Sequence, residues 1–167
     1  MVTAAAITVS DKGYAGLRAD KSGPLLGELL TRLGFEVVFS TIVPDEREQI
    51  AALLCELADV RGITLVVTTG GTGAAPRDVT PEATKEVIER EMPGLAELIR
   101  LEGYKKTPFA VLSRGVAGIR KGTLIINLAG SPKAVEEGME ILAPVLPHAL
   151  QMLRGENLEH THKSGQS

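Results

Sequence analysis

The chain has 167 residues, of which 44% are hydrophobic and only 3% aromatic, a composition that fits one globular domain with an aliphatic core rather than a disordered or fibrous chain. Its 18 lysines and arginines against 21 acidic residues give a formal net charge of -3, so we expect no general attraction to nucleic acid or to an anionic membrane. Residues 1–10 lack the basic and apolar segments of a secretion signal, and no apolar run reaches the ~18 residues of a membrane span. We therefore expect a cytoplasmic protein in which any bound anion is held by groups at its binding site, and not by the overall charge.

Short β-rich runs alternate with helical segments along the chain, which predicts a three-layer α/β/α domain with parallel strands joined by crossover helices. Strands are expected at 4–9 and 36–40, and the leucine-rich helix between them ends at Gly34. Residues 63–68 are nearly all apolar or β-branched, as in a central strand that is covered on both faces. That strand runs directly into a cluster of glycines.

The helix between the second and third predicted strands begins beside an ambiguous acid. Asp45 is followed three residues later by Glu48, a spacing typical of a capping pair, and this favours helix capping over a chemical role for Asp45. The same helix contains the single cysteine, Cys55, which cannot form an internal disulfide. We expect Cys55 to be buried and inert rather than a catalytic thiol.

After the glycine cluster, Thr80 and Pro81 read as the N-cap and first residue of a helix that continues to about residue 90. Pro93 interrupts this pattern and a second helix follows it. Further strands are expected at 109–112 and 123–127 because these runs are apolar and β-branched.

The C-terminal third contains a second junction of strand, loop and helix, at Gly130-Ser131-Pro132, and a last helix at about 144–153. We expect one domain over residues 1–154 and a polar tail over 155–167. The histidines lie near or in this tail, far from every glycine cluster, so we do not expect a histidine-based metal site. They are His148, His160 and His162.

The two glycine clusters are the first candidates for chemistry. In an open parallel sheet, ligands bind beyond the carboxyl ends of the strands, where loops meet helix N-termini. Gly70-Gly71-Thr72-Gly73 and Gly130-Ser131-Pro132 can both present main-chain N–H groups to an anion such as phosphate, although tight turns that need positive φ explain either cluster alone. Pro76 breaks the dinucleotide fingerprint, and no Gly-Lys-[Ser/Thr] completes an ATP-binding P-loop.

Polar residues beside these loops extend the candidate site. Asp78 stands two residues before a helix N-cap, where its carboxylate could ligate a Mg²⁺ that bridges phosphate oxygens, or could serve only as a turn residue. Ser10 and Asp11 follow the first strand and reach the same edge if that strand is parallel. Ser113 and Arg114 could supply a hydroxyl and a cation to a phosphate, or could simply be solvated loop residues.

Seven segments resemble, in order and spacing, the MogA/MoaB family of molybdenum-cofactor biosynthesis proteins. They are Ser10-Asp11-Lys12, Pro44-Asp45-Glu46, Thr69 to Gly73, Arg77 to Thr84, Glu91 to Gly94, Ser113-Arg114 and Gly130 to Ala134. The resemblance covers about residues 4–154, and its most specific part is the glycine loop with residues 77–83. Similarity is greatest to the MogA members.

The resemblance implies a three-layer α/β/α fold with a mostly parallel sheet and one antiparallel strand. It also implies molybdopterin adenylyltransferase activity, in which molybdopterin attacks the α-phosphate of ATP to give adenylylated molybdopterin and pyrophosphate, with Mg²⁺ as cofactor. Members are commonly homotrimers, and a partner enzyme later inserts molybdate into the product.

Carried over by position, the resemblance implies that Asp45 and Asp78 are the catalytic acids, and we expect these two carboxylates to place Mg²⁺. The residues expected to bind the nucleotide and the pterin are Ser10, Asp11, Gly70, Gly71, Thr72, Gly73, Glu82, Ser113, Arg114, Gly130, Ser131, Pro132 and Ala134. One position departs from the family pattern: Ala129 replaces the usual proline, which frees φ and restores an N–H donor without removing a ligand group.

Two other functions remain open at this point. A binding or scaffold module of the MoaB type would hold molybdopterin without turnover, and ATP-dependent release of pyrophosphate would distinguish it from the enzyme. A generic nucleotide-dependent α/β enzyme acting on another phosphate ester would require the family resemblance to be coincidental.

Overall fold

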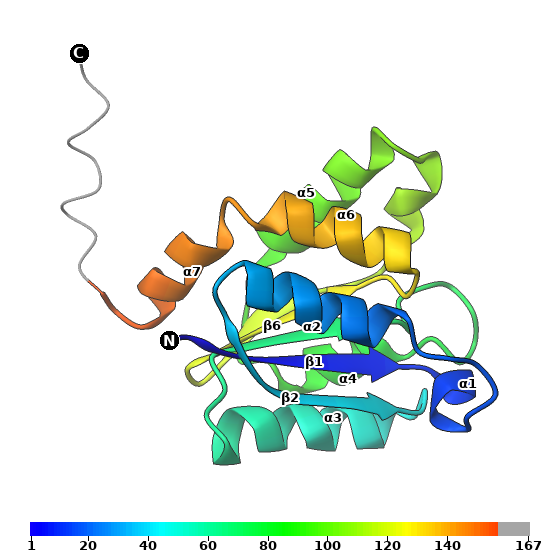
Figure 1. Ribbon diagram of the computed structural model, residues 1–167, viewed down its shortest axis with the longest axis horizontal. Helices are drawn as coiled ribbons and strands as arrows, with labels where there is room; N and C mark the ends of the chain where they lie inside the picture. The colour runs from blue at the N-terminus through cyan, green and yellow to red at the C-terminus, as the bar shows by residue number, and fades with distance from the viewer. Residues whose placement is uncertain (157–167) are drawn as a thin grey trace.

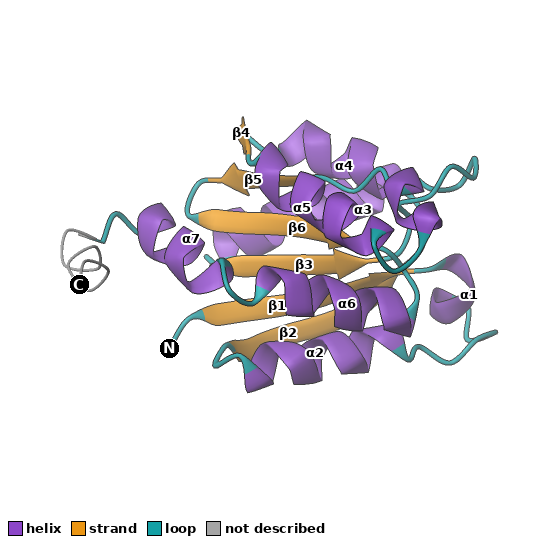
Figure 2. Ribbon diagram, turned by 90° about the horizontal axis from the view of Figure 1, so that it is seen from above, coloured by secondary structure: helices purple, strands orange, loops and turns teal. Residues whose placement is uncertain are grey.

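The computed structural model describes residues 1–156, which form a six-stranded sheet between two layers of helices (Figures 1 and 2). The strands are β1 (Thr3–Val9), β2 (Glu36–Val43), β3 (Leu65–Thr69), β4 (Arg90–Glu91), β5 (Ala117–Arg120) and β6 (Thr123–Leu128). The α-helices are α1 (Asp11–Tyr14), α2 (Ser22–Arg32), α3 (Arg47–Cys55), α4 (Thr80–Val87), α5 (Pro93–Tyr104), α6 (Pro132–Leu142) and α7 (Leu146–Leu153). A π-helical turn, η1 (Glu56–Val60), extends α3, and a 3₁₀ turn, η2 (Pro108–Leu112), follows α5.

The strand order is β2-β1-β3-β6-β5-β4. β1 pairs in parallel with β2 and β3, and β3 pairs in parallel with β6, so the carboxyl ends of these four strands share one edge. β5 runs antiparallel to both β6 and β4. The predicted mostly parallel sheet with one reversed strand is therefore confirmed.

Strand residues alternate between two cores because successive side chains point to opposite faces of the sheet. Ala4 and Ala6 pack with the layer of α2, α5, α6 and α7, whereas Ala5 and Ile7 pack with α3, η1 and α4 on the other face. Figure 1 shows these two layers above and below the strands. Every residue of β3 is buried, as its continuous apolar sequence predicts. None of the helices within residues 1–156 is long and apolar enough to cross a membrane.

The strand predicted at 109–112 is wrong, because this run forms η2 instead. Thr107 caps the turn by accepting a hydrogen bond from the N–H of Phe109 at 3.4 Å, and Pro108 occupies its first position. Phe109 is 73% exposed, which the apolar composition of the run did not indicate. The next strand along the chain is β5, a short glycine-containing segment between β6 and β4 that the pattern did not reveal.

Several boundaries also differ from the prediction. The N-cap of α3 is Glu46 rather than Asp45, and it makes no side-chain capping bond. Thr80 lies inside α4, whose N-cap is Val79, and the helix ends at Val87 rather than near residue 90. Ser131 caps α6 as its place before Pro132 indicates.

Cys55 is partly rather than fully buried, and it packs against the core beneath α3. The polar tail predicted for 155–167 lies outside the described residues from position 157 onward.

Candidate functional site

The two glycine loops meet at the carboxyl edge of the parallel strands. The N–H of Gly70 donates to the carbonyl of Leu128 at 3.0 Å, and the Thr69 hydroxyl donates to the carbonyl of Ala129 at 2.8 Å. A Cβ added to Gly130 would lie 3.2 Å from the Cα of Gly70. The loops after β3 and β6 are therefore packed directly against each other.

Glycine is required at this contact for two separate reasons. Gly70 and Gly71 have φ values of 103° and 68°, a region that side-chain-bearing residues rarely adopt. An added Cβ would also lie 2.2 Å from the Val9 carbonyl oxygen at Gly70, and 2.3 Å from the Thr80 hydroxyl at Gly71. The positive φ expected of a tight turn is therefore present at these glycines. Neighbouring chain segments also approach them too closely for a side chain.

Two pockets open on either side of this contact. The first, of about 500 Å³, lies between the end of β6, α6 and the α5-η2 segment, and the second, of about 570 Å³, lies beyond the ends of β1 and β3. Both volumes suit small-molecule ligands. The residues common to both linings are Gly71, Asp78, Gly130 and Ser131. The pockets thus adjoin at the glycine loops.

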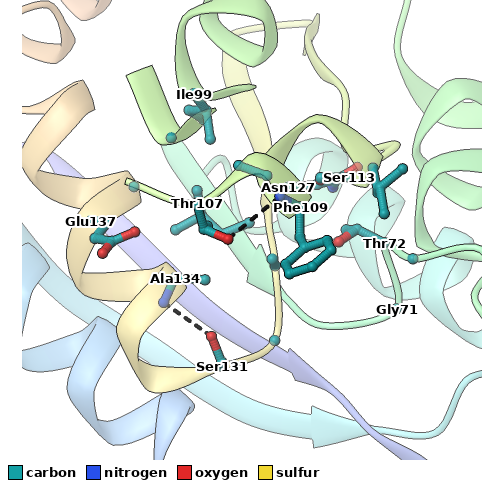
Figure 3. Close-up of a pocket in the computed structure, with 18 of the residues that line it drawn as sticks. Gly71, Thr72, Ile99, Thr107, Phe109, Ser113, Asn127, Ser131, Ala134 and Glu137 are labelled. Atoms are coloured by element: carbon teal, nitrogen blue, oxygen red, sulfur yellow. Dashed lines mark hydrogen bonds between the residues drawn. The ribbon is translucent and has the colours of Figure 1, made fainter. Parts of the chain in front are cut away.

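The first pocket combines an apolar wall with several polar side chains (Figure 3). Ile99 and Phe109 line it from α5 and η2, Thr107 lines it from the residue before η2, and Glu137 lines it from α6. The side chain of Glu137 is only 18% exposed, and Lys133 approaches its carboxylate no closer than 3.9 Å. This arrangement suits a flat heterocycle with hydrogen-bond donors at its edge.

The second pocket is more polar and lies beside the start of α2. Asp20 accepts hydrogen bonds from the Thr8 hydroxyl at 2.8 Å and from the N–H of Gly23 at 2.9 Å, which fixes the segment before the helix. Two exposed cations, Arg18 and Lys21, line the pocket. These cations and the main-chain amides of the loops can neutralise phosphate groups.

Asp45 is held by a reciprocal pair of hydrogen bonds with Asp11. The N–H of Asp11 donates to Asp45 Oδ2 at 2.8 Å, and the N–H of Asp45 donates to Asp11 Oδ1 at 2.9 Å. Arg77 forks onto both oxygens of Asp11 at 3.0 Å and also reaches Glu46 at 2.9 Å. Asp45 is thus oriented by Asp11 at the start of α1 and does not cap α3, which corrects the expected capping role.

The pKa values of Asp45 and Asp11 are shifted in opposite directions. Burial raises the pKa of the Asp45 carboxyl above its ordinary value, and the charges of Asp11 and Asp78 act in the same direction, although the Asp11 N–H opposes them. The hydrogen bonds from Arg77 lower the pKa of Asp11. Asp11 is therefore the stable partner of a cation, whereas Asp45 is a partly buried acid near two other negative charges.

Asp78 lines both pockets, and contacts within its own loop hold its side chain in place. Its Oδ2 accepts from the N–H of Ala75 at 3.0 Å, the turn role expected as the alternative to chemistry. A Cβ added to Gly73 would lie 2.8 Å from the same oxygen, so the carboxylate rests on the bare face of that glycine. The turn bond and exposure to both pockets occur together, so one role does not exclude the other.

Most of the predicted site residues line at least one pocket. They are Asp45, Asp78, Ser10, Gly70, Gly71, Thr72, Gly73, Ser113, Gly130, Ser131, Pro132 and Ala134. Asp11, Glu82 and Arg114 line neither. Arg114 instead donates to the carbonyls of Gly73 and Asp78 and to the Glu82 carboxylate, so its guanidinium contacts protein where a phosphate contact was expected.

Sequence reasoning missed many of the lining residues, including six with polar or charged side chains that bear on ligand binding. These six are Arg18, Asp20, Lys21 and Ser22 in the second pocket, and Thr107 and Glu137 in the first. A signal was available for the first four, because they immediately precede a helix at the strand-end edge where phosphate was expected. No sequence signal marked Thr107 and Glu137, because a residue in a turn or on a helix has no local pattern that shows which cavity its side chain faces.

The fold and the paired pockets define a ligand-binding α/β protein, and comparison with known proteins assigns its family. Residues 5–148 match the family described as a probable molybdopterin binding domain. The match covers most of the chain, so the chain belongs to this family.

Individual relatives agree with this assignment. The chain is 42% identical over 169 residues to the molybdopterin adenylyltransferase of Escherichia coli K12, covering 92% of this chain and 86% of the relative. It is 39% identical over 163 residues to that of Helicobacter pylori 26695, covering 96% and 93%. The cinnamon protein of Drosophila melanogaster, a molybdenum cofactor synthesis protein, is 43% identical over 153 residues, but the match covers 91% of this chain and only 26% of that longer protein.

Solved structures share the fold along nearly the whole chain. The molybdopterin biosynthesis enzyme MoaB of Thermus thermophilus has a TM-score of 0.89 and 52% identity, covering 93% of this chain and 98% of that one. A structure of MogA has a TM-score of 0.86 and 41% identity, covering 90% and 99%. The predicted MogA/MoaB resemblance is confirmed.

Proposed function

We propose that this protein is a molybdopterin adenylyltransferase, which transfers AMP from ATP to molybdopterin and releases pyrophosphate. The observation that carries the proposal is the pair of ligand-sized pockets that adjoin at Gly71, Asp78, Gly130 and Ser131. A reaction between two substrates needs two binding sites whose reacting ends meet. Relatives about 40% identical over most of their length bear the name molybdopterin adenylyltransferase.

The two linings divide the binding work between them. The apolar wall of the first pocket, including Ile99 and Phe109, suits a flat heterocycle, and its polar edge at Glu137 suits ring N–H groups. The second pocket combines Arg18 and Lys21 with loop amides and suits phosphate groups. A phosphate bridging the shared rim would therefore place its phosphorus beside Asp78.

The chemistry requires little covalent help from the protein. A phosphate oxygen of molybdopterin attacks the α-phosphorus of ATP, a new P–O bond forms, and the bond to the pyrophosphate leaving group breaks. The main barriers are charge repulsion and alignment. The glycine-loop amides stabilise the negative oxygens, while the rigid contact between the loops after β3 and β6 keeps those amides in place.

The acids at the rim fit a bound Mg²⁺. Asp45 and Asp78 present hard oxygen ligands to the second pocket, and the pKa of Asp45 is raised partly by the charge of Asp78, which a divalent cation would relieve. Within residues 1–156, no group of three or more His, Cys, Asp or Glu side chains could hold a metal by itself. This matches Mg²⁺, which commonly binds one or two carboxylates together with substrate phosphates. When bound, Mg²⁺ would neutralise charge on the phosphate oxygens.

The decisive experiment measures ATP-dependent pyrophosphate release with molybdopterin and Mg²⁺. We expect turnover by the wild-type protein and a loss of roughly 100-fold in Asp78→Asn, which removes a charge at the rim without changing shape. Turnover of Asp78→Asn within about threefold of wild type at saturating Mg²⁺ would reject the role of Asp78. Binding of molybdopterin without pyrophosphate release would instead support the scaffold function.

The cellular setting rests on the family resemblance. We propose a cytoplasmic homotrimer that passes adenylylated molybdopterin to a molybdenum-inserting enzyme. Light scattering on the purified protein would give its mass directly, and a monomer would contradict the trimer.

A further inference from the structure

Arg114 lies in the loop between η2 and β5 and clasps the loop that carries Asp78. Its Nε donates to the carbonyl of Gly73 at 2.8 Å, and its Nη2 donates to the carbonyl of Asp78 at 2.7 Å. Its main-chain N–H donates to the carbonyl of Thr72 at 2.9 Å. One residue therefore fixes both ends of the segment 73–78.

The geometry of that segment determines where the Asp78 carboxylate lies. Asp78 and Ala75 exchange two hydrogen bonds. The N–H of Asp78 donates to the carbonyl of Ala75 at 2.9 Å, and the N–H of Ala75 donates to Asp78 Oδ2 at 3.0 Å. Because Oδ2 also rests against Gly73, any shift of the loop moves the carboxylate with it. A misplacement of about 1 Å at a reacting centre can cost roughly 100-fold in rate.

The guanidinium of Arg114 is already engaged by the protein at all three of its nitrogens. Its third nitrogen, Nη1, donates to Glu82 Oε1, so each nitrogen of the fork has a protein acceptor. Arg114 lines neither pocket. Glu82 anchors the fork from the first turn of α4, and its Oε2 is buried without a hydrogen-bond partner among the described residues. The hydrogen bond from Arg114 is the largest effect that lowers the pKa of the Glu82 carboxyl, so the guanidinium compensates the charge of this carboxylate.

We propose that Arg114, held by Glu82, is a positioning residue that sets the Asp78 carboxylate at the junction of the two pockets. The proposal rests on the adenylyltransferase function proposed above. In this proposal Arg114 binds the protein's own loop, whereas the sequence suggested that it binds a substrate phosphate. Only a planar fork reaches two carbonyls and a carboxylate at once, and an ammonium group cannot reproduce that geometry.

The kinetic test compares wild type with Arg114→Lys, which retains the charge but loses the fork. We expect kcat to fall roughly 10- to 100-fold and KM for ATP to change less than about twofold, with a higher Mg²⁺ concentration at half-saturation. Arg47→Lys is the matched control, because Arg47 forms an exposed ion pair with Glu86 on the α3-α4 face, and its kinetics should equal wild type. A raised KM with unchanged kcat would overturn the proposal and make Arg114 a phosphate ligand.

A second readout is independent of turnover. Hydrogen exchange of a peptide covering residues 72–80 should be faster in Arg114→Lys and in Glu82→Gln, while a peptide from β1 keeps its wild-type rate. Unchanged exchange in both variants would overturn the proposal even if kcat fell. A wild-type protein without turnover would reject the adenylyltransferase function, yet the exchange result would still decide whether Arg114 orders the Asp78 loop.

Discussion

At the scale of single residues, Gly70 illustrates how contact and conformation combine. Its φ of 103° disfavours any side chain, and an added Cβ would lie 2.2 Å from the carbonyl oxygen of Val9. Gly34 has a similar φ of 93° but nothing within 4 Å of an added Cβ. A substitution at Gly34 therefore measures the free-energy cost of the positive φ without a steric clash. We expect Gly34→Ala to cost about 1–2 kcal/mol of unfolding free energy and Gly70→Ala to cost about 1–3 kcal/mol more. Urea denaturation of both variants measures the difference, and equal losses would contradict a steric role for Gly70.

The roles of the arginines could not be predicted at the residue scale. The sequence indicates the glycines well, because a buried apolar strand followed by glycines predicts where a loop must turn sharply. Arg114, by contrast, reaches Gly73, which lies 41 positions away, and Arg77 reaches Asp11 across 66 positions. A loop cation has the same local sequence pattern whether it binds a phosphate or a carbonyl. Only the packing of the loops distinguishes these roles.

At the scale of elements, Arg77 connects the loops that follow β1, β2 and β3. It pairs with Asp11 and Glu46, and its positive charge lowers the pKa of Asp45, which burial and neighbouring acids raise. Replacing Arg77 by glutamine removes that charge, so the pKa of Asp45 rises further and a more alkaline solution is needed to ionise it. We expect the acid limb of the kcat/KM profile to move to higher pH by less than about one unit, since Asp11 stands between the two groups.

The matched control for this pH shift is Arg61→Gln. Arg61 pairs with Glu56 beyond the end of α3 and lies over the ring of Phe39 at 4.4 Å, away from both pockets. Its profile should coincide with that of wild type. An acid limb that stays in place for Arg77→Gln would show that Asp45 does not control the profile.

Elements also differ in how well their sequences predict them. β3 is recognisable because both of its faces are buried, and α2 because its leucines recur on one side. The segment 109–112 is equally apolar, but its side chains face solvent and the first pocket, so composition alone predicted the wrong element. β5 was missed because Gly118 permits a close approach to Ile88, a contact that no local pattern encodes.

At the scale of the whole molecule, one ion pair joins the sheet to a helical layer away from both pockets. Arg120 in β5 forks onto Asp59 in η1 at 2.9 and 2.7 Å and also donates to the carbonyl of Val87 at 2.9 Å. β5, which lies next to the edge strand β4, is thereby fastened to the layer of α3 and α4. The hydrogen bonds from Arg120 lower the pKa of Asp59 below its ordinary value.

The lowered pKa gives the stability of this connection a defined pH dependence. Because the folded-state pKa of Asp59 lies below the unfolded one, its contribution is complete above the unfolded value and is lost as pH falls through the folded value. Asp59→Asn should therefore lower the urea midpoint at pH 7, by a few tenths of a molar for a partly exposed pair, and the deficit should shrink toward zero in acid. Glu36→Gln, at an exposed position in β2 on the opposite edge, should leave the midpoint unchanged at both pH values. A deficit in Asp59→Asn that persists undiminished in acid would mean that the asparagine disrupts packing, and that the ion pair with Arg120 does not stabilise this connection.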